Sequence, residues 1–337
     1  MKTQTIQPKV VYSDKYNFNF DNSLLDLVRE LHPFDSHKYA NVWKIITNSI
    51  PDIDQIKIDV DSKITEDELK LAHSEDYLKK LLNLSYIAKA IEIPELAVAV
   101  KLLSVLPCSD ISESSIRKSI LNPMKWATKG TILAGYESLE NGIAINLSGG
   151  YHHASRNKGE GFCIYSDVAI AIKHLQKNGK LTTEDNILII DLDVHQGNGL
   201  ERIFHDDNHV HIFDMYNSSI YPQDQWARKR VNNNFDLPLN SGMEDDSYLT
   251  TLHDNLPRFI TSVQSPKIAF YIAGTDILEE DPLGEFNVSE NGILARDKYV
   301  IDTLVDNGIP CVMVLGGGYT KQSATIIANS IKNILIY

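Results

Sequence analysis

An apolar run that ends in Asp-x-Asp-x-His constrains the fold of this chain more than any other feature. Residues Ile187 to Ile190 are all apolar, and Asp191, Asp193 and His195 follow at alternate positions. Residues two apart on a strand share a face, so these three side chains are expected to point the same way where a buried strand ends. Two carboxylates and an imidazole are costly to bury without a charged partner. A divalent metal is the simplest partner, and Asp with His suits zinc.

The rest of the chain alternates short apolar runs with amphipathic segments. Ser166 is expected to cap a helix that stops at Asn178-Gly179, Ser289 to cap one that ends before Gly308, and Ala127 to Glu140 to form a third. This alternation predicts parallel β-α-β units, an α/β fold with a predominantly parallel central sheet flanked by helices on both faces. The expected strands are Lys9–Tyr12, Ile143–Leu147, Ile187–Leu192, His209–Phe213, Lys267–Ile272 and Pro310–Leu315.

Polar clusters follow these strands where each one ends. In parallel folds ligands gather at the carboxyl ends of the strands, so the clusters are expected to converge on one site. Besides Asp193 and His195, the clusters are Gly149-Gly150-Tyr151-His152-His153, Ala273-Gly274-Thr275-Asp276 and Gly316-Gly317-Gly318-Tyr319.

Length and composition favour one enzyme-sized domain. The 337 residues are 43% hydrophobic, and no repeat or Pro- and Ser-rich linker divides them, so residues 1–337 are expected to form a single domain. The net charge of -13 argues against nonspecific nucleic-acid binding. Three cysteines (Cys108, Cys163 and Cys311) fit a reducing compartment. Without an apolar signal-peptide core or a membrane span, the sequence favours a cytoplasmic protein, and a monomer is plausible.

Asp193, His195 and Asp276 are the candidate metal ligands. A catalytic zinc usually has three protein ligands and one position open for water. The alternative is a set of solvated loop residues with a helix-capping aspartate, and Asp276 alone would be an ordinary turn residue. The apolar strand before each cluster favours the metal site.

The adjacent His152 and His153 are candidates for general acid and base beside a metal-bound water. Asp191 is available behind one ring and Asn198 behind the other. Tyr319 is a candidate hydrogen-bond donor to the oxyanion of a tetrahedral intermediate, and the alternative is a surface tyrosine on a flexible turn. Cys163 is interpreted as a packed thiol, because a Cys-His nucleophile would leave the Asp/His set unexplained.

The ordered set of motifs resembles the zinc-dependent histone deacetylase family, and most of all its class IV branch. The resemblance runs over almost the whole chain. It covers Val10–Ser13, His32–Asp35, Leu71–His73 with Tyr77–Leu78, Gly149–Ser155, Gly161–Cys163, Asp191–Gly199, Tyr216–Asn217, Ile220–Pro222, Ala273–Leu278 and Gly316–Tyr319.

The resemblance implies an arginase/deacetylase fold and assigns roles to the candidate residues. It places one zinc ion on Asp193, His195 and Asp276. It makes His152 and His153 the acid/base pair, with His153 the proton shuttle, and Tyr319 the transition-state donor. It also implies a substrate channel and a structural K⁺ or Na⁺; the channel residues are Phe162, Tyr221, Gly161 and Gly317, and the monovalent-cation residues are Asp191, Asp193, His195 and Asp214.

Two positions depart from the commonest family pattern, in which a second histidine and an aspartate stand where this chain has Gln196 and Asn198. A neutral partner behind His153 should raise the proton affinity of that ring less than a carboxylate would. Members of the class IV branch also remove long fatty-acyl groups from lysine.

Four functions fit these observations to different degrees. The favoured one is zinc-dependent hydrolysis of Nε-acyl-lysine in a protein or peptide, and the alternative substrate is a small acylated amine such as an acetylpolyamine. An arginase-like enzyme with two manganese ions would need a further carboxylate where Gly197 stands. A catalytically inactive acyl-lysine binding module would predict damage to the metal ligands, the histidines or Tyr319, and all of them are present.

Overall fold

The computed structural model describes residues 6–18, 35, 37–105, 112–232 and 234–335. They contain one eight-stranded sheet in the order β2-β1-β3-β8-β7-β4-β5-β6, in which each strand runs parallel to its neighbours. The strands are β1 Lys9–Tyr12, β2 Lys57–Asp59, β3 Ile143–Asn146, β4 Ile187–Asp191, β5 Val210–Asn217, β6 Asp236–Leu239, β7 Ile268–Ile272 and β8 Cys311–Val314.

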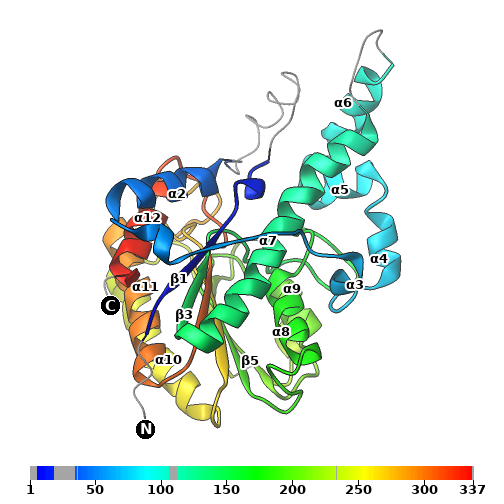
Figure 1. The fold of residues 1–337 in the computed structure, drawn as a ribbon. Helices are drawn as coiled ribbons and strands as arrows, with labels where there is room; N and C mark the ends of the chain where they lie inside the picture. Colours follow the sequence, from blue (N-terminus) through cyan, green and yellow to red (C-terminus); the bar gives the residue numbers. More distant parts are fainter. Residues whose placement is uncertain (1–5, 19–34, 36, 106–111, 233, 336–337) are drawn as a thin grey trace.

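Helices cover both faces of this sheet, as the alternating sequence pattern predicted (Figure 1). One layer contains α7, α8 and α9, and the other contains α2, α12, α11 and α10. The helices are α2 Lys38–Ser49, α3 Glu66–Leu69, α4 Glu75–Lys80, α5 Leu84–Ala90, α6 Glu95–Leu103, α7 Glu113–Asn141, α8 Asp167–Lys177, α9 Asn198–Ile203, α10 Asp245–Ser262, α11 Glu290–Asp306 and α12 Ser323–Leu335.

The predicted strands are all present, with ends that shift by a few residues, but β2 and β6 were missed. Both lie at the edges of the sheet, where a strand needs no continuous apolar run. The sequence of β2 is Lys-Ile-Asp, and β6 contains Pro238, a residue that sheets tolerate mainly at their edges.

Two helix predictions need correction. The segment predicted over Ala127 to Glu140 is the second half of α7, which begins after the capping hydroxyl of Ser112 and ends at Asn141, with Gly142 as its C-cap. Ser166 does not cap α8 through its side chain; instead its backbone N–H donates to Nε2 of His73. Ser289 does cap α11, since its hydroxyl accepts from the N–H of Gly292.

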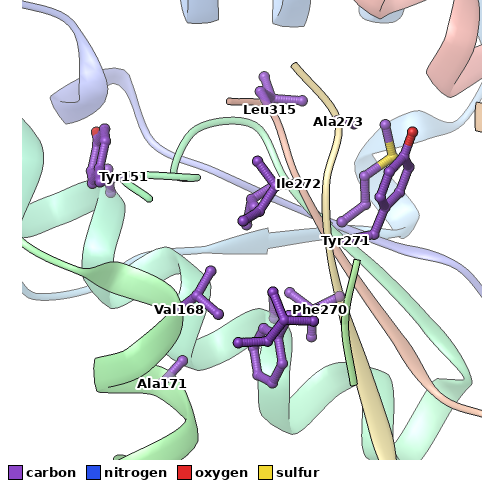
Figure 2. Close-up of a cluster of buried hydrophobic side chains, with 14 of the residues drawn as sticks. Tyr151, Val168, Ala171, Phe270, Tyr271, Ile272, Ala273 and Leu315 are labelled. Carbon is purple, nitrogen blue, oxygen red and sulfur yellow. The ribbon is translucent and has the colours of Figure 1, made fainter. Parts of the chain in front are cut away.

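The core lies between the sheet and the helices (Figure 2). Val168 and Ala171 of α8 pack toward Phe270 and Ile272 of β7, and all four are buried. Burying one large apolar side chain contributes roughly 1.5–3 kcal/mol, so the central strands form a rigid base for the loops at their carboxyl ends. None of the helices in the described ranges has both the length and the apolar character that crossing a bilayer requires.

Candidate active site

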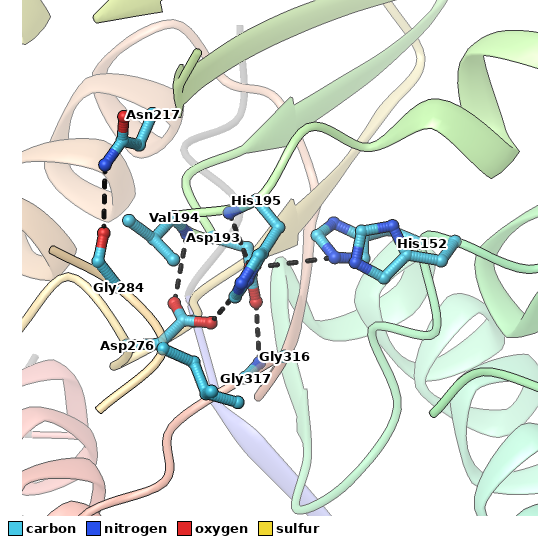
Figure 3. A network of polar contacts seen from close by, with 12 residues as sticks. His152, Asp193, Val194, His195, Asn217, Asp276, Gly284, Gly316 and Gly317 are labelled. Carbon is cyan, nitrogen blue, oxygen red and sulfur yellow. Dashed lines mark hydrogen bonds and ion pairs between the residues drawn. The ribbon is translucent and has the colours of Figure 1, made fainter. Parts of the chain in front are cut away.

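Asp193, His195 and Asp276 meet at the carboxyl ends of the neighbouring strands β4 and β7 (Figure 3). Nδ1 of His195 lies 3.1 Å from Oδ1 of Asp193 and 3.2 Å from Oδ2 of Asp276. All three residues are buried, and one ligand atom from each lies within 4.8 Å of the other two. An imidazole nitrogen and two carboxylate oxygens form a donor set that suits zinc.

The three residues of the Asp-x-Asp-x-His sequence do not share one strand face, which corrects the sequence interpretation. β4 ends at Asp191, and Asp193 and His195 lie on the turn that follows. Oδ1 of Asp191 accepts the N–H of Asp193 at 3.2 Å, and Oδ1 of Asp193 accepts the N–H of His195 at 3.0 Å. This turn directs Asp193 and His195 toward Asp276, while Asp191 faces His152.

The charges at this cluster fit a bound cation. Burial lowers the pKa of His195, but hydrogen bonds to Asp193 and Asp276 outweigh it and raise that pKa to about 10. Burial and the charge of Asp193 raise the pKa of Asp276. Two buried carboxylates thus hold a proton on His195 when no metal competes, and a metal ion bound by the three groups would replace that proton.

Glycine loops bring the backbone close to the cluster. The N–H of Gly317 donates to Oδ2 of Asp193 at 2.6 Å, and a Cβ on Gly317 would come within 2.8 Å of the same oxygen. The buried Lys38 holds the loop from behind, with Nζ 3.2 Å from the carbonyl oxygen of Gly316 and 3.5 Å from that of Gly318. Only glycine permits this close approach.

The adjacent histidines lie beside the cluster, with ring centroids 4.1 Å apart. Nδ1 of His152 lies 2.8 Å from Oδ2 of Asp191, and Nδ1 of His153 lies 2.8 Å from Oδ1 of Asn198. The loop that carries them is held by Asp167, whose carboxylate accepts the N–H groups of Gly150 at 3.0 Å and Tyr151 at 2.8 Å.

The surroundings separate the two histidines by charge. Burial lowers the pKa of His152, but the carboxylates of Asp191 and Asp193 raise it to about 9. Burial, followed by the neighbouring His152 and His195, lowers the pKa of His153 well below its usual value. At neutral pH one ring is charged and the other is neutral, and pairs separated in this way are typical of acid/base sites.

Tyr319 and Phe162 line a cavity next to these groups. Their ring centroids lie 5.8 Å apart, and that of Tyr319 lies 6.5 Å from His195. Gly161 and Gly317 line the same cavity, and Gly161, with a φ of 54°, has no space for a side chain because the His153 ring fills it. The ring centroid of Tyr221 lies 5.1 Å from that of His153, but Tyr221 lines a second, polar cavity and not the one that contains Phe162.

Beyond the histidines this cavity continues between apolar side chains, a feature that was not predicted from the sequence. The walls are Tyr39, Ile91, Ile93, Leu96, Ile120 and Met124. They come from α2, from the segment around α5 and α6, and from the first half of α7. The cavity therefore has polar groups at Asp193, His152 and His153 and an apolar interior.

Asp214 lies beside Asp191 on the neighbouring strand, in register with it. Its Oδ2 accepts the N–H of Gly197 at 2.9 Å, but its buried Oδ1 has no hydrogen-bond partner among the described residues. Burial and the charge of Asp191 raise the pKa of Asp214 well above its usual value. Asp214 forms a second group of carboxylates with Glu201 and Asp236, and one oxygen of each lies within 4.8 Å of the other two. The side chains of Asp193 and His195, by contrast, turn to the first cluster.

Several residues that hold the site were not identified from the sequence. They contact it from distant segments through hydrogen bonds, and no local pattern marks them. Besides Lys38 and Asp167, they are Asp281, which accepts the N–H of Tyr319 at 2.8 Å, and Glu160 and Asp224, which contact Asn198. Part of the predicted His32–Asp35 motif, residues 32–34, lies outside the described residues.

Comparison with known proteins identifies the family. Residues 32–335 match the histone deacetylase domain. The chain is 35% identical to histone deacetylase 2 of Arabidopsis thaliana, over 96% of this chain and 78% of that protein. It is 28% identical to the acetoin utilization protein AcuC of Staphylococcus aureus, over 92% of this chain and 76% of that protein. Fold and site thus define a hydrolase of the deacetylase type, and the chain belongs to the histone deacetylase family.

Solved structures confirm the predicted fold. A crystal structure described as an HDAC homolog complexed with SAHA has a TM-score of 0.72 and 24% identity, covering 98% of this chain and 84% of the other. The HDA15 HD domain has a TM-score of 0.70 and 20% identity, covering 97% of this chain and 90% of the other. Both likenesses concern the arginase/deacetylase fold, and the class IV assignment stays a prediction.

Proposed function

We propose that this chain hydrolyses the amide bond of Nε-acyl-lysine with one zinc ion held by Asp193, His195 and Asp276. The observation that carries the proposal is this buried donor set beside one cationic and one neutral histidine. Zinc bound there would supply a Lewis acid that activates water and polarises the amide carbonyl.

His153 is suited to move the proton. Its low pKa leaves the ring neutral, and its Nδ1 faces the amide oxygen of Asn198, so Nε2 is free to accept a proton. The same nitrogen would then deliver a proton to the departing lysine amine. His152 is kept cationic by Asp191, and its positive charge would stabilise the negative charge that develops on the carbonyl oxygen of the amide.

Tyr319 is the proposed donor to that oxygen. It follows the glycine loop that packs on Asp193, and Asp281 holds its backbone N–H. Burial raises the pKa of its phenol well above the usual value, so the hydroxyl keeps its proton and can donate. Such a donor aimed at a developing oxyanion stabilises the transition state more than the substrate.

The substrate side chain is proposed to enter between Phe162 and Tyr221, past Gly161 and Gly317. The apolar interior beyond the histidines then supports a further assignment, namely that the acyl group lies against Ile93, Leu96 and Met124 and that long acyl chains are accepted. Each buried methylene contributes about 0.8 kcal/mol, so chain length should affect affinity strongly.

Asp191 and Asp214 support the proposal of a structural K⁺ or Na⁺. They are adjacent carboxylates in register on β4 and β5, and the unpartnered Oδ1 of Asp214 is buried there. The backbone around Asp193 and His195 would complete such a site. We further propose that residues 1–337 act as one catalytic domain, because one sheet includes strands from Lys9 to Val314.

A panel of substrates tests the proposed function. Lysine peptides carrying acyl groups from acetyl to myristoyl, together with acetylputrescine, are incubated with the protein before and after zinc chelation. We expect the protein to release the carboxylic acid from the acyl-lysine peptides. This activity should be lost when zinc is chelated and should return when zinc is added. Turnover of acetylputrescine alone would assign the small-amine alternative, and turnover that survives complete removal of metal would contradict the mechanism.

A further inference from the structure

We propose that Glu160 and Asp224 are positioning residues that act on His153 through Asn198. The proposal deepens the proposed function and rests on the part given there to His153. Neither carboxylate contacts the metal cluster in the described structure; each touches the amide that contacts the ring.

Asn198 links the ring to the two carboxylates. It is 2% exposed, and its Oδ1 lies 2.8 Å from Nδ1 of His153. Its Nδ2 lies 3.3 Å from Oε1 of Glu160 and 3.5 Å from Oδ2 of Asp224. One side of the amide therefore faces the histidine, and the other faces two acidic side chains.

This arrangement fixes the orientation of the Asn198 side-chain amide. Ionised carboxylates only accept hydrogen bonds, so they require the amide NH₂ on their side and leave the amide oxygen for His153. A reversed amide would place its oxygen against two carboxylates and its NH₂ against the ring. Because the oxygen only accepts, Nδ1 of His153 must carry hydrogen, and Nε2 on the opposite side of the ring is the nitrogen left free.

Both carboxylates are themselves held in place. Oδ2 of Asp224 lies 2.6 Å from Nε of Arg202, and its Oδ1 accepts the N–H groups of Trp226 and Ala227, each at 3.1 Å. Burial raises the pKa of Asp224, but the Ala227 N–H and Arg202 outweigh it and lower that pKa below its usual value. Gln196 fixes the same loop, since its Oε1 accepts the N–H of Asp224 at 2.9 Å.

Glu160 pairs with Lys158 and precedes Gly161, whose backbone packs on the His153 ring. It lies in a polar cavity with Asn198, Asp224 and Tyr221. The two carboxylates therefore act on His153 indirectly, because the side-chain amide of Asn198 lies between them and the ring. For this reason an aspartate at position 198 would not be an equivalent partner in this chain, because it would put a third carboxylate beside the other two.

The experiment combines a double-mutant cycle with a direct view of the ring. The variants are Asn198→Asp, Glu160→Gln and the two together, with Glu184→Gln as a control that removes an exposed carboxylate elsewhere. For each, kcat and KM are measured on the acyl-lysine peptide and the melting temperature is recorded. Nitrogen NMR on wild type with labelled histidine measures which nitrogen of His153 carries hydrogen. The signal of His153 is identified because it is missing from the spectrum of His153→Gln.

We expect wild-type His153 to carry hydrogen on Nδ1. Asn198→Asp should lower kcat about tenfold or more with little change in KM, and Glu160→Gln should restore most of it, because neighbouring groups couple strongly. The proposal would be overturned if the kcat of the double variant equalled the product of the two single effects. It would also be overturned if the NMR spectrum placed the hydrogen of His153 on Nε2. A wild type that cleaves no acyl-lysine would refute the proposed function, and the tautomer would still decide this inference.

Discussion

Oδ2 of Asp191 lies 2.8 Å from Nδ1 of His152, and this contact makes the two adjacent histidines chemically different. The neighbouring ring, His153, faces the neutral amide of Asn198 at the same distance of 2.8 Å. One histidine therefore keeps a positive charge at neutral pH while the other stays neutral. The proposed acid/base roles of His152 and His153 depend on this difference.

Replacing Asp191 with Asn should lower the pKa of His152 and change how stability depends on pH. The carboxylates raise the pKa of His152 from 6.5 to about 9, so its contribution to stability is fully present below pH 6.5 and is lost as pH rises through about 9. Chelator-treated wild type should therefore lose stability over this range relative to Asp191→Asn. Urea denaturation at a series of pH values measures the difference, and parallel curves would contradict the assigned contact.

Replacing Tyr319 with Phe should leave the metal bound but reduce turnover. Loss of one oxyanion donor costs roughly 10²–10³ in kcat, and the phenyl ring keeps the packing on Phe162. Metal analysis and steady-state kinetics on the same preparation test both halves of this expectation. Tyr299→Phe, which removes a hydroxyl from a tyrosine on α11, is the matched control. Near-normal turnover in Tyr319→Phe would remove the residue from the mechanism.

Filling the apolar cavity should shorten the preferred acyl chain. Ile93→Trp adds bulk at a half-buried wall position, so kcat/KM for a myristoyl peptide should fall about tenfold or more while acetyl turnover changes little. Leu102→Trp adds the same bulk at an exposed position, 64% accessible, and should change neither. Equal losses for both acyl lengths would mean that the acyl chain does not lie in this cavity.

The sequence predicted the parts of the site that follow apolar strands. Ile187–Ile190 marks β4, and the polar residues just after it could be assigned without tertiary information. Asp276 is an ordinary turn aspartate until β7 places it beside Asp193. Because parallel strands carry their loops to one edge of the sheet, topology alone was enough to bring these residues together.

The residues that hold the site could not be predicted in this way. Lys38, Glu160 and Asp224 contact the site through hydrogen bonds to residues far away in the sequence, and such contacts leave no periodic pattern. The edge strands β2 and β6 were missed for a related reason, since only one side of each pairs with the sheet. The first half of α7 was not predicted because it contains Pro123, a residue that normally ends or kinks a helix.

The central claim is that Asp193, His195 and Asp276 together hold one catalytic metal ion. The direct measurement is a zinc titration of chelator-treated protein that follows bound metal and acyl-lysine turnover together, in wild type and in Asp276→Asn, with Asp206→Asn as a control at an exposed carboxylate. The account predicts turnover that rises in proportion to zinc and levels off at one ion per chain, with Asp276→Asn losing both. Full turnover without metal, a requirement for two ions, or unchanged zinc binding in Asp276→Asn would contradict it.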